Sequence, residues 1–527
     1  MNKLRSYFFA GCTLFTLSAK AQVPDAPIDV LHYGFNIVLT DASNNIKGKA
    51  DISVKFLTTP GTFHIDLVKK KASGPGMIVS RVLEDGKPVR FQQDSDAINI
   101  NTQAQQNSQK TYSIFYEGVP ADGLIISSNK FGKRTFFGDN WPNRAHNWIP
   151  CVDEPADKAS VDFTVTAPDH YQVIANGLKI SERVLPGQLK KTHWAATAQL
   201  PTKVMVIGVA DFAVDHPKDV GDIPVYTYVF PQDAMIGFKS YAIAGDILPF
   251  YIKKIGPYAY KKLANVQSKT IFGGMENASC IFYFENSTSS KGIEELMAHE
   301  IAHQWFGDAV TEKDFHHLWL SEGFATYLTN YYLENKYGVD TLKKRLIADR
   351  IKVLQFEKKR FTPVVDTSVK ADYMQLLNAN SYQKGSWVLH MLRRKLGDGA
   401  FWKGLNTYYL KYQGANANTA DFRDVMEQIS GQNLKPFFHQ WLNTPGHPDL
   451  AINWIYDQKT RIVDITVDQK QSNLYTFPLE VDIDGELHTI DMTGKSTTVH
   501  IAAGKKLPVI TVDPNVNLLA SYTVNGE

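Results

Sequence analysis

The sequence has few cysteines and, beyond its first twenty residues, no long apolar run. It contains Cys12, Cys151 and Cys280 and no other cysteine. Cys12 lies in a segment that we expect to be removed, and two remaining cysteines exclude both a disulfide-stapled scaffold and a thiolate zinc site. The sequence does not decide whether these two pair. Later stretches do not reach the roughly 18 apolar residues of a spanning helix, so we expect no stable membrane insertion.

An excess of charge of one sign is also missing. The formal net charge is +2 over 527 residues. A nearly neutral surface gives no electrostatic reason to expect nucleic acid or an anionic membrane as a partner. The length suggests about three domains, and the oligomeric state stays open.

The N-terminal segment differs from the rest. Two bases precede an apolar run over residues 7–17, and Ala19-Lys20-Ala21 supplies small residues at the cleavage-determining positions. This pattern predicts a signal peptide over residues 1–21 and export to the periplasm or the medium. Residues 9–12, FAGC, resemble a lipoprotein signal, but the apolar run before the cysteine is short for one.

Three segments differ in hydrophobic period. Residues 22–230 alternate with period two, as in "GFNIVLT" and "SVDFTVTA", which predicts an antiparallel β-domain. Residues 231–445 are mostly of helical period, their runs often end at glycine, and Thr419 is the expected N-cap of one helix. Residues 446–527 alternate again and contain the hairpin signal Asp484-Gly485, which predicts a small β-sandwich.

The decamer MAHEIAHQWF, residues 297–306, carries a metal-binding pattern. His299 and His303 are four residues apart, so on a helix both imidazoles face one ion. Glu300 lies beside them, within reach of a water on that ion, and zinc lowers the pKa of such a water to about 7. By itself the pattern is only moderately specific.

A hydrolytic zinc site needs a third protein ligand and an open fourth position. Glu322, in LWLSEGFATYL, follows His303 by 19 residues within another helical pattern. It is the candidate third ligand, although an acid in the first turn of a helix also occurs for its favourable interaction with the helix dipole. His316 and His317 are weaker competitors, because they lie in a polar loop segment.

Further motifs resemble those of the M1 metallopeptidases, the gluzincin zinc aminopeptidases. Residues 273–277, GGMEN, are similar to the G-x-M-E-N signature, and the HEXXH helix has its third-ligand Glu at the family's spacing. NSYQKGSWVLHML places the family's tyrosine at Tyr382, and stretches from about residue 28 to the end match as well. Several independent motifs occur in the family's order.

The resemblance implies an architecture. It predicts a multidomain α+β chain with an N-terminal β-saddle at residues 22–230, a thermolysin-like catalytic domain at 231–445 and a β-sandwich at 446–527. Many relatives continue into a large helical domain that covers the active site. We expect a short form without that domain, and therefore a more open cleft unless another subunit covers it.

The resemblance also implies roles. His299, His303 and Glu322 would bind one Zn²⁺ per chain, and Glu300 would activate the zinc-bound water that hydrolyses the N-terminal peptide bond. Glu276 would hold the free amino group of a peptide substrate, with Gly273, Gly274, Met275 and Asn277 around it. Tyr382 would donate a hydrogen bond to the developing oxyanion.

Three positions depart from the family pattern. The family adds a second Gln or Glu to the amino-group site, but the stretch before "PC", FFGDNWPNRAHNWIPC, has neither. Asp139 is the acid available there. Asp308 and Ser321 stand where the family often has Asn, and because neither is a ligand position we expect them to tune the residues behind the ligands.

Two other functions remain as alternatives. A zinc endopeptidase would share the helix but would need no acid for a substrate amino group, so GGMEN argues against it. A catalytically inactive M1-like binding module would be expected to have lost a ligand or the base, whereas all are present. The sequence therefore predicts a zinc-dependent aminopeptidase that acts on peptides with a free N-terminus.

Overall fold

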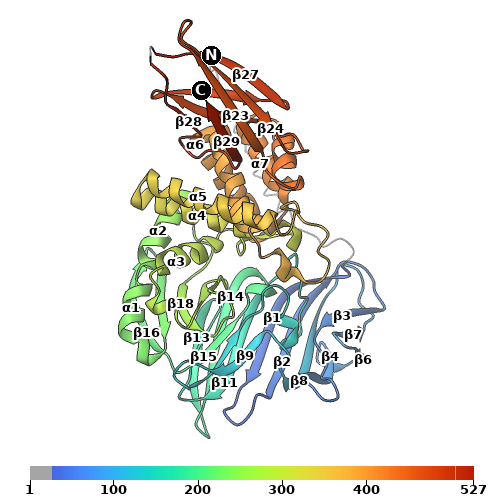
Figure 1. The fold of residues 1–527 in the computed structure, drawn as a ribbon. Coiled ribbons are helices and arrows are strands. Elements are labelled where there is room, and N and C mark those ends of the chain that lie inside the picture. The colour runs from blue at the N-terminus through green and yellow to red at the C-terminus, as the bar shows by residue number, and fades with distance from the viewer. Residues whose placement is uncertain (1–25, 505, 527) are drawn as a thin grey trace, which may run out of the picture.

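The computed structural model describes residues 26–504 and 506–526. The predicted signal peptide, residues 1–21, lies outside the described residues. The described chain is multidomain α+β: a strand-rich N-terminal region, a helix-rich middle and strand-rich C-terminal sheets follow one another along the long axis (Figure 1). Within these residues, no helix combines the length and the apolar composition that crossing a bilayer requires.

An eight-stranded sheet dominates the N-terminal region, in the order β13-β14-β11-β1-β2-β8-β4-β5. Its β1 and β11 are parallel and the other neighbours are antiparallel. The strands are β1 (Ile28–Val38), β2 (Ile46–Phe56), β4 (Gly76–Glu84), β5 (Lys87–Pro88), β8 (Gln109–Val119), β11 (Lys158–Pro168), β13 (Leu178–Leu185) and β14 (Leu189–Pro201).

Strand β1 shows how the alternating pattern produces this sheet. Its Tyr33, Phe35 and Ile37 are buried while the residues between them are partly exposed, as expected for a sheet with one face on the core. Val30 is buried too, out of phase with that series, because the register with β2 shifts between Val30 and His32. A β-bulge there returns the apolar side chains to one face.

Two smaller sheets complete the N-terminal region. One has the order β12-β15-β10-β9 and the other β3-β7-β6. Their strands are β3 (Thr62–Asp66), β6 (Phe91–Gln93), β7 (Ala97–Asn101), β9 (Leu124–Ser128), β10 (Arg134–Gly138), β12 (Gln172–Ala175) and β15 (Ile207–Ala210). Cys151 and Cys280 are both buried and unpaired.

A five-stranded mixed sheet, β16-β17-β18-β20-β19, leads into the helical region. Its strands are β16 (Ala213–Val220), β17 (Ile223–Val229), β18 (Leu263–Ser268), β19 (Gly274–Met275) and β20 (Cys280–Phe284). A domain boundary at residue 230 would cut this sheet, because β17 pairs in parallel with β18. The alternation of β16 and β17 looks like that of the preceding strands, so sequence period alone does not reveal their different partners.

The helical region contains α1 to α8 and a short parallel pair of strands. These elements are α1 (Ala234–Tyr241), α2 (Ala244–Ile255), α3 (Ile293–His303), α4 (Trp319–Tyr337), α5 (Val339–Glu357), α6 (Gly385–Tyr412), α7 (Thr419–Ser430), α8 (Lys435–Phe438), β21 (Val310–Glu312) and β22 (Ala415–Ala417). Three of the helices, α2, α4 and α7, end at a glycine with positive φ, which matches the sequence expectation.

The N-cap of α7 is Asn418, and the prediction of Thr419 was wrong. The Asn418 side chain accepts hydrogen bonds from the backbone N–H groups of Ala420 at 2.8 Å and Asp421 at 3.1 Å. Asp421 in turn accepts from the Asn418 backbone, which completes a capping box. Thr419 instead accepts a hydrogen bond from Trp319 Nε1.

Two sheets form the C-terminal region, β27-β24-β23-β29 and β26-β25-β28. Their strands are β23 (Asp449–Asp457), β24 (Ile462–Gln469), β25 (Phe477–Ile483), β26 (Glu486–Met492), β27 (Ser496–Ala502), β28 (Ile510–Val512) and β29 (Ser521–Gly526). The hairpin predicted at Asp484-Gly485 joins β25 to β26, and both turn residues have positive φ.

Candidate metal centre and active site

Helix α3 brings two imidazoles together. It begins after Gly292 with Glu294 and Glu295 in its first turn, where acids suit the helix dipole. His299 and His303, one turn apart, point the same way, and their Nε2 atoms are 3.1 Å apart. The prediction that both rings share one face of a helix is confirmed, although the helix ends at His303 and the last three residues of the decamer lie beyond it.

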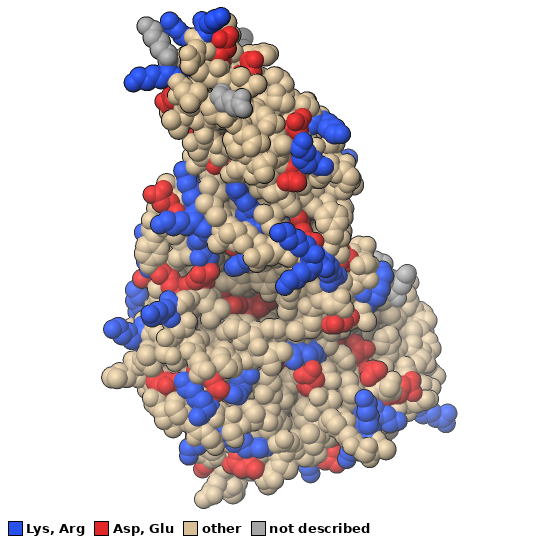
Figure 2. Space-filling model, viewed as in Figure 1, with Lys and Arg blue, Asp and Glu red and all other residues tan. Residues whose placement is uncertain are grey.

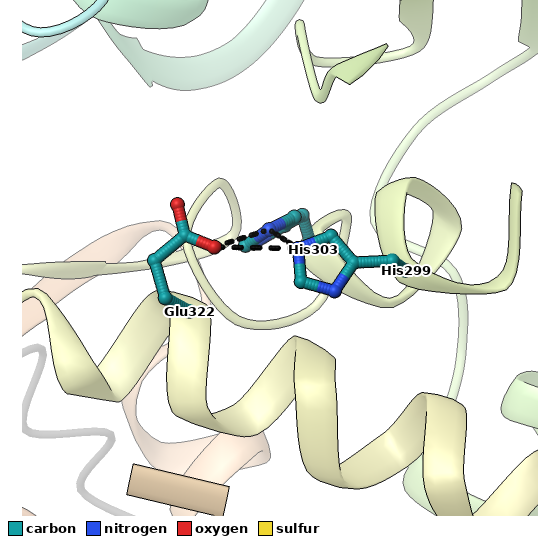
Figure 3. A group of neighbouring side chains, drawn as sticks. All are labelled: His299, His303 and Glu322. Carbon is teal, nitrogen blue, oxygen red and sulfur yellow. Dashed lines mark hydrogen bonds and ion pairs between the residues drawn. The ribbon is translucent and has the colours of Figure 1, made fainter. Parts of the chain in front are cut away.

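Helix α4 adds a carboxylate to the pair. Glu322 Oε2 lies 3.3 Å from His299 Nε2 and 3.3 Å from His303 Nε2. Figure 3 shows the three side chains converging from α3 and α4 on one point. Their candidate ligand atoms all lie within 4.8 Å of one another, and two imidazoles with one carboxylate are a ligand set that suits zinc.

Two contacts at Nδ1 fix the orientation of the His303 ring. Its Nδ1 lies 3.1 Å from the backbone carbonyl of Phe306 and 3.1 Å from Ser321 Oγ. An Nδ1–H that donates to the carbonyl would leave Nε2 to bind a metal ion through its lone pair, which is the tautomer that a metal ligand needs. Ser321 therefore touches a candidate ligand directly.

Negative charge is concentrated around these imidazoles. Burial raises the pKa of Glu300 well above its ordinary value; Glu276 and Glu322 raise it further, against the opposing effect of His303. Burial lowers the pKa of His303, but the carboxylates of Glu276 and Glu322 outweigh it and bring that pKa to about 10. Three buried carboxylates so close together need cationic compensation, from a proton or a metal ion.

The side chains of His299, His303 and Glu322 line a cavity of about 270 Å³. Figure 2 shows the surface hollowed between the N-terminal strands and the helices, with acidic side chains deep in the hollow. The cavity is lined by Trp141, Phe272, Gly273, Gly274, Met275, Glu276, Leu296, His299, Glu300, His303, Glu322, Leu377 and Tyr382. It therefore combines one charged end with an apolar wall.

The GGMEN segment forms another part of this wall. Glu276 is 5% exposed, and its Oε1 has no hydrogen-bond partner among the described residues. Because Glu276, Glu300 and His303 also place ligand atoms within 4.8 Å of one another, Glu276 is close to the imidazole–carboxylate group. Asn277 is fully buried and does not line the cavity.

Tyr382 closes the cavity from the side of α6. Its ring stacks on His299 with centroids 6.0 Å apart and planes 12° apart. Burial and the neighbouring carboxylate of Glu322 raise the pKa of Tyr382 well above its usual value. The hydroxyl therefore keeps its proton and remains a hydrogen-bond donor.

The structure does not bring Asp139 to the cavity. The carboxylate is fully buried, with Oδ1 2.8 Å from the guanidinium of Arg144. Its Oδ2 accepts from Thr270 Oγ1 at 3.1 Å and from the backbone N–H of Ile271 at 2.9 Å. Oδ2 thus holds the loop before GGMEN and Oδ1 is paired with Arg144, which argues against Asp139 as a second amino-group ligand.

His316 and His317 are held elsewhere. His316 Nε2 lies 2.7 Å from the carbonyl of Val369, and His317 Nδ1 lies 2.8 Å from Thr419 Oγ1. Neither belongs to a metal-ligating group among the described residues.

Two residues at the cavity were not singled out from sequence, Gln304 behind its wall and Trp141 in its lining. Gln304 donates to the backbone carbonyl of Glu276 at 2.6 Å and to Asp308 Oδ2 at 2.9 Å, so Asp308 acts on Glu276 through Gln304. Trp141 lines the cavity in the stretch where an acid was sought. Gln304 adjoins His303 in sequence, whereas nothing in the pattern distinguishes Trp141 from other buried aromatics.

Comparison with known families accounts for most of the chain. The Peptidase M1 N-terminal domain matches residues 30–204 and the Peptidase family M1 domain matches residues 240–441. The second match includes α3, α4 and the turn that carries Tyr382.

Relatives include a leucyl aminopeptidase of Saccharolobus solfataricus, 24% identical over 480 residues, which are 85% of this chain and 58% of that protein. The tricorn protease-interacting factor F2 of Thermoplasma acidophilum is 29% identical over 71% of this chain and 49% of its own length. A glutamyl aminopeptidase of Mus musculus is 27% identical over 63% of this chain and 37% of its own length. The chain thus spans roughly a third to three fifths of these relatives. Together with the two domain matches, this similarity establishes that the chain belongs to peptidase family M1.

Proposed function

We propose that this protein is a zinc-dependent aminopeptidase that hydrolyses the N-terminal peptide bond of peptides. The observation that carries the proposal is one cavity that holds two imidazoles, a carboxylate suited to zinc and a further buried carboxylate, Glu276, with an unpartnered oxygen. Family membership and the aminopeptidase relatives support it. The saddle and sandwich shapes of the terminal regions, and export by the signal peptide, are proposed on the resemblance and the N-terminal pattern.

His299, His303 and Glu322 would hold the zinc ion. Two nitrogen ligands and one oxygen ligand leave a fourth position toward the cavity, as hydrolytic zinc sites require. Zinc, when bound, polarises a carbonyl and makes a water acidic near neutral pH. The alternative group of Glu276, Glu300 and His303 has a single imidazole and is the poorer zinc site.

Glu276 would anchor the substrate amino group. Its side chain is 5% exposed and its Oε1 is buried without a hydrogen-bond partner among the described residues, so a substrate ammonium would satisfy that oxygen with a charge-assisted hydrogen bond. Such an anchor measures one residue from the N-terminus to the scissile bond, which separates an aminopeptidase from an endopeptidase.

Glu300 and Tyr382 would handle protons and charge. Glu300 lines the same cavity as the candidate ligands, so it would take a proton from the attacking water and pass it to the leaving amine. The Tyr382 hydroxyl would donate to the carbonyl oxygen as that atom becomes negative. Neither step is expected of a catalytically inactive binding module.

The cavity wall favours an apolar first side chain. Trp141, Phe272, Leu296 and Leu377 line it, and none of the described residues that line it is Lys or Arg. The relatives' names point to different first residues, leucyl and glutamyl, so the preference of this chain is argued from its own lining. The acids already present near the anchor would repel an acidic side chain.

A panel of aminoacyl reporter substrates tests the proposal. Leucyl and methionyl reporters should be cleaved, aspartyl and glutamyl reporters should be poor, and chelation should abolish turnover together with the zinc measured in the protein. Cleavage only of internal bonds in longer peptides would favour the endopeptidase alternative. No turnover in a zinc-loaded preparation would favour the binding module.

A further inference from the structure

Tyr382 is carried by an unusual turn. Residues Asn380–Lys384 form a single π-helical turn that continues directly into α6, and such turns occur frequently at functional sites. At its start, the Asn380 side chain donates to the carbonyls of Thr362 at 2.9 Å and Pro363 at 3.3 Å.

The end of the turn packs against α4. Gly385 and Gly323 approach so closely that a Cβ on Gly323 would lie 2.9 Å from the Gly385 backbone. Gly323 directly follows Glu322, so this contact sets the distance between the tyrosine turn and a candidate zinc ligand.

Lys384, at the end of the turn, is fully buried, and residues outside the turn bind its ammonium group. Its Nζ donates to Glu357 Oε1 at 2.9 Å and to the carbonyl of Gly446 at 2.6 Å. Glu357 is the last residue of α5, and its Oε2 is hydrogen-bonded to His447 Nδ1. Burial raises the pKa of Glu357, but His447 and Lys384 outweigh it and hold that pKa below its ordinary value, so the carboxylate stays ionised between them.

The outer end of this network lies at the C-terminal sheets. His447 Nε2 is 3.1 Å from Ser521 Oγ at the start of β29, and Tyr475 Oη donates to the Gly446 carbonyl at 2.9 Å. A cavity of about 440 Å³, which Glu357 and His447 also line, borders it. A continuous series of polar contacts therefore runs from β29 to the turn that carries Tyr382.

We propose that Lys384, Glu357 and His447 are positioning residues that hold the Tyr382 hydroxyl at the reacting carbonyl, and that the C-terminal sheets reach the active site through them. A hydroxyl that must meet a developing charge depends on sub-ångström placement of its turn. A buried Lys–Glu pair with further partners on each side is rigid, because removing one member leaves an uncompensated buried charge. This inference rests on the proposed function.

The test compares Lys384→Met with a matched control. Arg350→Met also removes an ion pair between α5 and the C-terminal region, since Arg350 lies 3.0 Å from Asp513. The guanidinium of Arg350 also lies over the rings of Trp387 and Tyr522, both outside residues 380–384. We expect Lys384→Met to lower kcat by about 10- to 100-fold with KM and zinc content nearly unchanged. Arg350→Met should keep wild-type kcat after correction for any fall in Tm.

A double-mutant cycle with Tyr382→Phe separates positioning from general damage. Without the hydroxyl, Lys384→Met should cause little further loss of kcat. Equal losses in the Lys384 and Arg350 variants, or a full Lys384 effect in the Tyr382→Phe background, would overturn the inference.

Glu357→Gln gives a milder variant in case Lys384→Met does not fold. It keeps an acceptor oxygen for Lys384 but removes the charge, so kcat should fall with KM and zinc content kept, and a wild-type kcat would count against the network. If the wild-type protein itself has no aminopeptidase turnover, the proposed function fails, and that result is distinct from an active wild type with an unaffected Lys384 variant.

Discussion

Gly274 packs directly against the carboxylate arm of Glu300. A Cβ placed on Gly274 would lie 2.6 Å from Glu300 Cγ, closer than real Cβ contacts occur, whereas a Cβ on Gly273 would meet nothing nearer than Leu296 Cδ1 at 3.9 Å. The two glycines of GGMEN therefore have different reasons to be small. The missing side chain of Gly274 leaves room for the proposed base, whereas a side chain on Gly273 would not contact Glu300.

Gly274→Ala should displace Glu300 without touching the proposed zinc ligands. A shift of about 1 Å in a catalytic group can cost on the order of 10²-fold in rate, so kcat should fall by about that much while zinc content stays at the wild-type level. Gly273→Ala is the control, because its methyl group has space. Similar kcat values for the two alanine variants would show that the contact does not position the base.

Glu300→Gln should abolish most turnover and leave zinc bound. General acid–base catalysis contributes about 10²- to 10⁴-fold, and a fall in kcat of that size is expected, with metal content measured on the same sample. Glu295→Gln, a more exposed acid on the same helix, should retain kcat. Wild-type turnover in the Glu300 variant would refute the base assignment.

Acetylation of the substrate's amino group should remove recognition by Glu276. The acetyl group abolishes the positive charge that would satisfy the unpartnered oxygen, so leucyl reporters should be cleaved much faster than their N-acetyl forms. Glu276→Gln should lower kcat/KM for the free substrate and reduce the ratio between the cleavage rates of free and N-acetylated reporters. Equal rates for free and blocked substrates in the wild-type protein would mean that Glu276 is no anchor.

Asp157, which is far in sequence from the candidate zinc ligands, should make the stability of the protein depend on pH. Burial raises its pKa from 3.8 to about 8, so between those values the folded protein holds a proton that the unfolded chain has released. The free energy of unfolding therefore falls as pH rises through this window, by up to about 1.4 kcal/mol per pH unit. Asp157→Asn keeps an acceptor for the Val30 N–H at 3.3 Å and should flatten the profile between pH 5 and 8.

Unfolding free energies at pH 5 and pH 8 check this expectation. The exposed Asp222 provides the control, and Asp222→Asn should follow the wild-type profile. Parallel profiles for the wild type and Asp157→Asn would contradict the assignment.

The hydrophobic period of the sequence predicts the helices and strands of this fold better than it predicts which strands pair. The helices of the HEIAHQWF and SEGFATYL segments and the Asp484-Gly485 hairpin were predicted from period, turn residues and spacing. The pairing of β17 with β18 was not, because an alternating strand carries no mark of the sheet it will join.

The candidate site shows the same division. Motif residues such as Glu276 and Tyr382 were found in sequence, and the structure places them around one cavity. Asp139 was chosen because it is an acid in the right stretch, yet Arg144 and the loop at residue 270 engage both its oxygens. Trp141 and the Lys384 network were missed, since their roles depend on contacts between segments distant in sequence.

The zinc content of the purified protein, measured by mass spectrometry after dialysis, tests the central claim most directly. We expect about one zinc ion per chain in the wild type, a large loss in Glu322→Ala, and full retention in His316→Ala, whose imidazole is held by Val369. A wild-type protein without zinc, or an equal loss in both variants, would contradict the assignment of His299, His303 and Glu322 as the metal site.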